Sequence, residues 1–204
     1  MQRKAARWIQ ALIALLVVAS LSSVAEAATL EIVPSASEAR YRVREQLAGY
    51  NFPNDAVGTT RSISGTITFD AQGRLVAGSK VTVDLRTLMS DEAKRDNYLR
   101  ANTLTTASFP YAELVPREVR GLPFPLPASG SASVQILGDL TVRGVTRPTT
   151  WDGTALFQGR AVRLQARTAF KFGDFDLTQP RIFRVLSIED LIRLEVDLTL
   201  RQAS

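Results

Sequence analysis

The sequence of 204 residues contains neither cysteine nor histidine. Without cysteine no disulfide can form, so an exported form of this chain has to be held together by its apolar core alone. Without histidine, Ser-His-Asp and Cys-His catalysis are excluded, and nearly every zinc or non-haem iron site loses its usual ligand. Asp, Glu, Lys, Tyr, Ser and Thr remain, so catalysis is disfavoured rather than excluded. We expect no catalytic residue, no metal site and no cofactor.

The first 27 residues have the organisation of an export signal. A basic start precedes the apolar stretch 8–21, and a small-x-small pattern ends at Ala27. We therefore expect cleavage after Ala27 and a periplasmic or extracellular location, with no stable membrane insertion afterwards. The alternative is an uncleaved membrane anchor, since residues 8–27 are close to the length that spans a bilayer. Acylation as a lipoprotein is excluded because there is no cysteine to carry the lipid.

The remaining residues, 28–204, are enough for one domain with a substantial core. Of the 25 basic and 20 acidic residues of the whole chain, most lie in this part, and they are spread along it. A protein that binds nucleic acid usually gathers its positive charge on one face. The composition therefore predicts a single domain without a nucleic-acid partner.

Alternation of apolar and polar residues with a period of two is the dominant pattern of the domain. In 192–200 five apolar residues alternate with charged or polar ones, so one face of that strand is apolar and the other wet. The same pattern predicts strands at 40–44, 62–69, 80–85 and 162–172, and more weakly at 29–33, 111–118, 130–142 and 146–157. This gives about eight or nine strands. Short turns between them favour antiparallel pairing, in a sandwich or a barrel.

Three segments depart from this pattern. Residues 90–100 predict one short polar helix, with Ser90 as its cap and ion pairs Asp91–Arg95 and Asp96–Arg100 at helical spacing. The stretch 47–60 is long for a connection and is predicted to be a lid or binding loop. The stretch 121–130 carries three prolines between three apolar residues. It is either a loop packed over one end of the barrel or an apolar rim that touches ligand or membrane.

Five strings, in order along most of the domain, resemble the YceI-like family of exported lipid- or polyisoprenoid-binding proteins. They are VTVDLRTLMSDEAKRDNYLR (81–100), NTLTTASFPYAEL (102–114), GDLTVRGVTRP (138–148), FGDFDLTQP (172–180) and SIEDLIRLEVDLTL (187–200). The resemblance implies an all-β, lipocalin-like antiparallel barrel of about eight strands with one helical insertion, enclosing a long apolar ligand. Many members carry a histidine early in the domain, whereas this chain has Ser35–Arg40 there.

A ligand inside such a barrel needs inward positions that the protein does not fill itself. The candidate lining residues are apolar members of the alternating pattern: Val43, Ile63, Ile67, Val83, Leu164, Phe170, Phe172, Ile192 and Leu194. The alternative is that they only pack against one another. A polar head group would lie at the mouth of the barrel, where arginines meet an anion. The candidates are Arg61, Arg95, Arg143 and Arg147, and the alternative for each is a solvated surface arginine.

The sequence therefore predicts a protein that binds or carries an isoprenoid, quinone, fatty acid or fatty amide without chemical change. Two other functions stay open. One is an outer-membrane or purely structural β-barrel without ligand, since alternation alone does not say which face points outward. The other is a hydrolase that uses carboxylates, either Asp91, Glu92 and Asp96 or Asp174 and Asp176. Whether the protein forms a homodimer is also open.

Overall fold

A computed structural model describes residues 26–49, 51–180 and 185–203. Most of the expected export signal, residues 1–25, lies outside this part, so its cleavage is untested. No helix in the described ranges is both long enough and apolar enough to cross a membrane.

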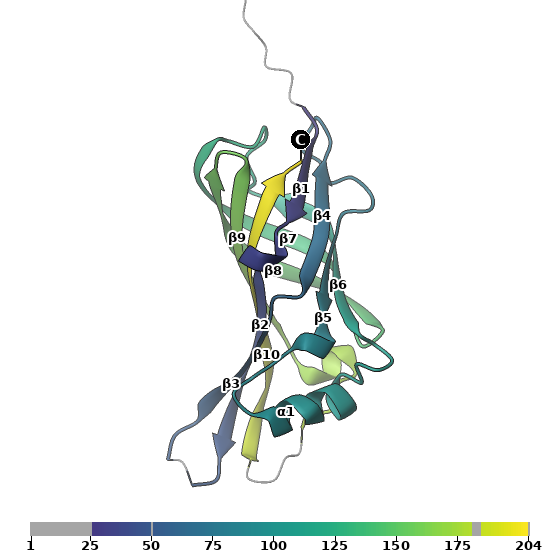
Figure 1. Cartoon of the computed structure of the whole chain (residues 1–204), viewed down its shortest axis with the longest axis vertical. Helices are drawn as coiled ribbons and strands as arrows, with labels where there is room; N and C mark the ends of the chain where they lie inside the picture. The colour runs from purple at the N-terminus through teal and green to yellow at the C-terminus, as the bar shows by residue number, and fades with distance from the viewer. Residues whose placement is uncertain (1–25, 50, 181–184, 204) are drawn as a thin grey trace, which may run out of the picture.

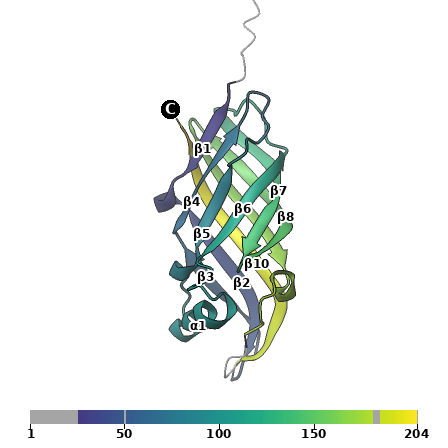
Figure 2. The same ribbon diagram turned by 90° about the vertical axis from the view of Figure 1, so that its right-hand side faces the viewer.

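In these ranges the chain forms one antiparallel sheet of ten strands (Figures 1 and 2). The strands are β1 (Ala28–Ile32), β2 (Glu38–Leu47), β3 (Asn54–Thr60), β4 (Ile63–Phe69), β5 (Lys80–Asp84), β6 (Tyr111–Arg120), β7 (Ser129–Val142), β8 (Val145–Gln158), β9 (Ala161–Phe170) and β10 (Val185–Gln202). β1 pairs with β4 on one side and with β10 on the other, where Leu30 lies opposite Gln202. This second pairing closes β1 and β4–β10 into a barrel of eight strands. The predicted barrel is confirmed, and the sandwich is excluded.

The long strand β10 holds the barrel and an extension together. Its last residues pair with β1, whereas its first two thirds pair with β2, with Ile192 opposite Val43. The 3₁₀ turn Pro34–Ala36 separates β1 from β2. β2 then turns back into β3, and this hairpin extends past the barrel beside the start of β10 (Figure 1). The prediction of a lid or loop at 47–60 is therefore wrong for residues 54–60, which form a strand.

The two ends of the barrel differ in the elements that lie there. The terminal end is where β1 begins and β10 finishes, and the helix end is where the helix α1 (Ala93–Tyr98) lies (Figure 1). One cluster of buried apolar residues fills the terminal end and includes Ile63, Phe69 and Phe157. The other lies toward the helix end and includes Trp151 and Phe175.

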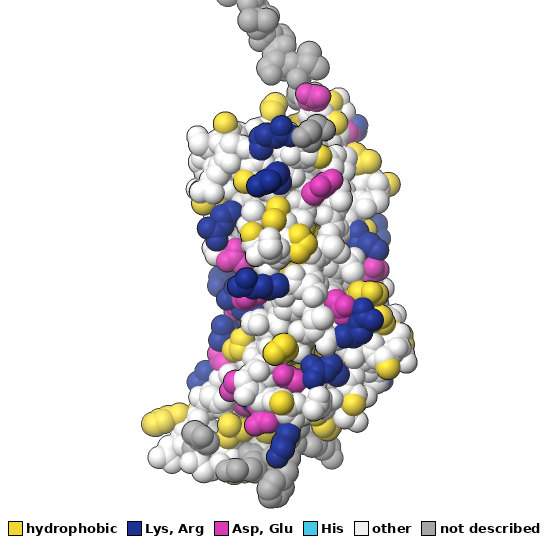
Figure 3. Space-filling model, in the orientation of Figure 1, with side chains coloured by type: hydrophobic (Ala, Val, Ile, Leu, Met, Phe, Trp, Pro, Cys, Tyr) yellow, Lys and Arg dark blue, Asp and Glu magenta, His cyan; other side chains and the backbone are white. Residues whose placement is uncertain are grey.

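Charged side chains of the alternating strands lie on the outer surface. On β9, for example, the exposed residues include Arg163, Gln165 and Arg167, whereas the alternate residue Val162 is buried. Figure 3 shows basic and acidic side chains interspersed over the visible face. An outer-membrane barrel needs an apolar band on its outer face. In this barrel the apolar faces of the strands point inward and the charged faces point outward.

The proline-rich segment lies over the terminal end. Its apolar residues Leu122, Phe124 and Leu126 pack against the buried cluster there, and the rings of Phe124 and Phe69 are 6.1 Å apart. The prediction of a loop packed over the barrel is confirmed.

The helical insertion differs in detail from its prediction. Glu92, rather than Ser90, caps α1 through its side chain, and a π-helical turn, Leu99–Thr103, follows directly. The Asp91–Arg95 pair is present at 2.6 Å. The Asp96–Arg100 pair is wrong, because Asp96 is buried and accepts hydrogen bonds from Ser90, while Arg100 donates to the Leu88 carbonyl. The Asp96 carboxylate accepts from two donors, the backbone N–H and the hydroxyl of Ser90, and these hydrogen bonds replace the predicted arginine partner.

Among the described residues, three other than glycine adopt left-handed backbone conformations: Thr105, Arg143 and Asp176. Arg143 contacts the other two. Arg143 opens the two-residue turn between β7 and β8, whose primed geometry needs a positive φ. Its guanidinium donates to the Thr105 hydroxyl at 3.3 Å and to the Asp176 carbonyl at 2.8 Å. Arg143 thus ties this hairpin to two loops at the helix end.

We expect Arg143→Ala to lower the free energy of unfolding by about 2 kcal/mol, because it removes two hydrogen bonds and keeps the strained backbone. Arg143→Gly should cost only about 1 kcal/mol, because glycine adopts the left-handed conformation readily. Urea denaturation of both variants against the unsubstituted protein measures the difference. Equal stability of all three would show that the hydrogen bonds of Arg143 do not stabilise the fold.

Candidate functional site

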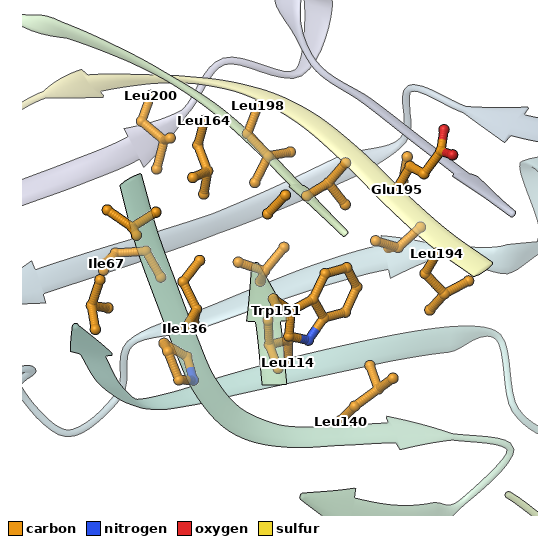
Figure 4. A pocket seen from close by; sticks show the side chains of 18 of the residues that line it. Ile67, Leu114, Ile136, Leu140, Trp151, Leu164, Leu194, Glu195, Leu198 and Leu200 are labelled. Carbon is orange, nitrogen blue, oxygen red and sulfur yellow. The ribbon is translucent and has the colours of Figure 1, made fainter. Parts of the chain in front are cut away.

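The interior of the barrel contains a large apolar cavity, here called the main cavity. It has a volume of about 170 Å³ and is lined by side chains from β1, β2 and every strand from β4 to β10. Figure 4 shows Ile67, Leu164 and Leu200 converging on this space from different strands, with Trp151 and Leu140 at its other side. Its lining is almost wholly apolar, with Arg40, Tyr41 and Glu195 as the polar exceptions.

Small inward side chains leave this space open. Ala39, Ala112, Ala155 and Ala166 all line the main cavity at positions where a strand could carry a larger residue. Ala166 lies opposite Gly153, whose added Cβ would come within 2.4 Å of the Gln165 carbonyl oxygen. A side chain at Gly153 would thus collide with the backbone of β9. The alanines could have been found in the sequence as small members of the period-two pattern.

A second apolar cavity of about 120 Å³, the helix-end cavity, lies beside α1. Its walls come from β2, β3, β6, β7, β9, β10 and the segments 85–104 and 172–180. Five side chains line both cavities: Tyr41, Leu85, Leu88, Ala112 and Leu194. The two cavities therefore adjoin and together follow the length of the barrel.

The predicted lining residues fall in both cavities. Ile67, Val83 and Leu164 line the main cavity, Val43, Phe170, Phe172 and Ile192 line the helix-end cavity, and Leu194 lines both. Ile63 lines neither and is 1% exposed, packed in the buried cluster of the terminal end. A role of these residues in binding stays a prediction.

Sequence reasoning missed several residues of the lining. Val196, Leu198 and Leu200 continue the inward face of β10 beyond Leu194 and line the main cavity. The alternating pattern of 192–200 contained them. Trp151 lines the same cavity, and its indole N–H donates to the Thr149 hydroxyl at 3.0 Å. No pattern in the sequence distinguished that tryptophan, because which residues of β8 reach the cavity depends on the register of the strands.

The helix-end cavity contains a buried ion pair. The Glu45 side chain on β2 is 4% exposed and the Arg95 side chain on α1 is 12% exposed, and their nitrogen and oxygen atoms lie 2.8 Å apart. Arg95 also pairs with the exposed Asp91. Burial lowers the pKa of Arg95, but the hydrogen bond to Asp91 and the charge of Glu45 outweigh that effect, so its pKa lies above the ordinary value. This arginine is a cation whose charge is already compensated.

Ser90 extends this cluster toward the chain before α1. Its hydroxyl donates to Asp96 at 2.6 Å and accepts a hydrogen bond from Arg95 at 3.2 Å. Both carboxylate oxygens of Asp96 also accept from the backbone N–H of Ser90 at 3.0 Å. A buried network of this kind holds α1 against the barrel in one orientation.

Two buried hydroxyls at this cavity make no hydrogen bond of ordinary length and angle with any described residue: those of Tyr41 and Thr103. Ser90 interacts weakly with the Tyr41 phenol and lowers its pKa by less than burial raises it. Tyr41 lies across Gly58 on β3, where an added Cβ would come within 2.2 Å of the ring. Burial raises the pKa of Tyr41 to about 12, and the charge of Arg95 lowers it by less. The phenol therefore keeps its proton under physiological conditions. Thr103 is 3% exposed.

Of the four arginines proposed for a head group, only Arg95 lines a cavity. Arg61 is exposed and lies 3.7 Å from Glu38, and Arg147 is exposed and donates to the neighbouring Thr146 carbonyl. Arg143 is engaged in the loop contacts described above. Position along the sequence could not separate these four, because only the packing of α1 brings Arg95 inside.

The carboxylates considered for a hydrolase have structural partners. Asp91 pairs with Arg95, Glu92 caps α1 and Asp96 binds Ser90. Asp174 accepts from the Lys171 backbone N–H at 2.7 Å at the start of a 3₁₀ turn, and Asp176 ends that turn. None of these five lines either cavity. Their arrangement therefore does not favour a pair of carboxylates acting on a ligand inside the barrel.

The chain is similar to known proteins over most of the barrel domain. Residues 30–200 match the family model described as the YceI-like domain. Protein YceI of Escherichia coli O157:H7 is 29% identical over 160 residues, which cover 75% of this chain and 78% of that protein.

Two solved structures resemble the barrel. One is described as a polyisoprenoid binding domain from Saccharophagus degradans implicated in plant cell wall breakdown; it has a TM-score of 0.66 and 13% identity, over 85% of this chain and 98% of that one. The other is BcnA from Burkholderia cenocepacia, with a TM-score of 0.61 and 15% identity, over 82% and 98%. At these identities the likeness is one of fold.

We expect Tyr41 to titrate late, and its titration to destabilise the protein. The folded protein holds the phenol proton more tightly than the unfolded chain, so the stability linked to it is complete below about pH 10 and lost as pH rises toward 12. The loss is about 3 kcal/mol. Tyrosinate absorbance and urea unfolding between pH 9 and 12 should show a late step that Tyr41→Phe removes. A Tyr41→Phe variant with the same alkaline profile would contradict this.

Proposed function

The chain belongs to the YceI-like family, and from that premise we propose that it binds one apolar, isoprenoid- or lipid-like molecule inside the barrel and carries it unchanged. The observation that supports the proposal most directly is the pair of adjoining apolar cavities along the barrel. A barrel of eight strands is just wide enough to be filled by side chains or to hold one small ligand. Here alanines stand where filling residues would be needed.

The binding energy would come from the removal of apolar surface from water. Each buried methylene contributes about 0.8 kcal/mol, so an isoprene unit of five carbons contributes roughly 4 kcal/mol before losses. The loss of translational and chain freedom offsets much of this gain. Several units of a flexible chain are thus sufficient for useful affinity without any polar contact.

The positions of the polar groups support binding without a chemical reaction. The carboxylates of the helix end hold α1 and the turn after β9 in place, and the cavities are lined almost wholly by apolar side chains. The basic and apolar start of the sequence supports action in the cell envelope. Isoprenoid lipids, quinones, fatty acids and fatty amides all have tails that suit such an interior.

The ligand itself can be identified by native mass spectrometry of protein purified from the envelope of its own host, followed by lipid extraction. We expect one apolar molecule per chain, or stoichiometric uptake of phytanol by protein freed of lipid. A mass equal to the bare chain, together with no uptake of phytanol, oleamide or a short-chain ubiquinone, would rule out the proposed function.

A substitution at the junction of the cavities tests where the ligand lies. Ala112 lines both cavities, so Ala112→Phe places a ring across their junction. We expect at least a tenfold loss of phytanol affinity, equivalent to about 1.4 kcal/mol. Ala169→Phe is the matched control, because Ala169 of β9 is exposed on the outer face.

The two variants are compared by titration calorimetry after thermal unfolding has shown that both are folded. Equal affinity of the two variants for phytanol would place the ligand outside the barrel.

A further inference from the structure

Two buried hydroxyls without partners lie at the helix-end cavity. A buried polar group that makes no hydrogen bond costs about 1–3 kcal/mol. The hydroxyl oxygens of Tyr41 and Thr103 are both buried and unpartnered within the described residues, and both residues line the helix-end cavity. Phenylalanine and valine would fill the same volumes without this cost. A hydroxyl at each of these positions is therefore not explained by packing alone.

The charges at this cavity decide which head group fits. Among the described residues that line it, Glu45 and Arg95 are the charged ones, and they pair with each other at 2.8 Å. Arg95 also binds Asp91, and the buried carboxylate of Asp96 lies behind it on Ser90. An anionic head group would have to displace Glu45 from its arginine and leave that carboxylate buried and unpaired, which is strongly unfavourable.

Resting on the function proposed above, we propose that Tyr41 and Thr103 form a polar subsite that binds the uncharged oxygen of a lipid head group, and that the Glu45–Arg95 pair excludes anionic head groups. A hydroxyl, ketone or amide oxygen suits the subsite, because each can accept from a hydroxyl hydrogen. The lipid chain would then extend past Leu194 and Ala112 into the main cavity. The high pKa of Tyr41 keeps its O–H available as a donor.

Three probes with one saturated C20 chain separate the effects of head and tail: phytane, phytanol and phytanyl phosphate. Binding is measured by titration calorimetry with protein produced from the full coding sequence and freed of lipid. For the unsubstituted protein we expect phytanol to bind about three- to tenfold more tightly than phytane, the value of one neutral hydrogen bond. Phytanyl phosphate should bind at least tenfold more weakly than phytanol.

Tyr41→Phe combined with Thr103→Val should remove the advantage of phytanol over phytane and leave the affinity for phytane unchanged. The melting temperature of the double variant, measured without added lipid, should rise by at least about 4 °C, because two unpaired hydroxyls are gone. Thr60→Val is the matched control: its hydroxyl is buried but bonded to that of Thr87 at 2.6 Å, so this variant should melt lower. Structural hydroxyls would give lower melting in all variants.

Glu45→Gln tests the exclusion of anions. It leaves Arg95 with only the exposed Asp91, so phytanyl phosphate should bind about tenfold more tightly than to the unsubstituted protein. If Glu45→Gln does not fold, Asp91→Asn provides a milder version with a smaller gain. Phosphate binding as tight as phytanol binding in the unsubstituted protein, or a double variant that still prefers phytanol, would overturn the subsite. Failure of all three probes to bind would instead contradict the proposed function itself.

Discussion

The width of the barrel interior is the constraint on which the rest of this molecule depends. Strand number and tilt set that width, and the pairing of β1 with β10 closes the sheet at eight strands. Once the sheet is closed, inward side chains either fill the interior or leave it open. Alanines at Ala39, Ala112, Ala155 and Ala166 leave it open, while Ile63, Phe157 and Phe175 fill the regions around them. A cavity thus coexists with a well-packed core, and the cost of unfilled volume is spread over many strands.

The outer face of the sheet carries charged side chains, in contrast to the apolar interior. Arginines on neighbouring strands pair with carboxylates across the sheet, as Arg42 does with Asp55 and Glu195. Exposed pairs of this kind each contribute little to stability. Their value lies in keeping the outside wet and the edge of the β2–β3 hairpin polar, since a strand edge without charges invites pairing with another chain. The high arginine content of the sequence reflects this surface.

The helix end combines polar and apolar groups at close quarters. The buried pair of Glu45 and Arg95 and the Ser90–Asp96 contact orient α1, whereas the same helix region supplies Leu99 and Leu104 to the apolar wall. Buried ion pairs rarely add much net stability, but they do restrict geometry. This end of the barrel is therefore the place where specificity for a ligand can be built without disturbing the closed sheet.

The sequence by itself determined most of the strands and their wet and dry faces, because period-two alternation is a local property of each strand. It did not determine closure: alternation left sandwich and barrel open, and residues 54–60, which form β3, were predicted to be a loop. Eight of the nine residues predicted to line a cavity do so, because the inward face of a strand consists of every second residue. Tertiary structure alone decided the rest. Whether an inward residue faces empty space, as Leu164 does, or solid packing, as Ile63 does, depends on the size of its neighbours from other strands. Likewise, Arg95 differs from Arg61 and Arg147 only because α1 folds against β2, a contact between residues 50 positions apart.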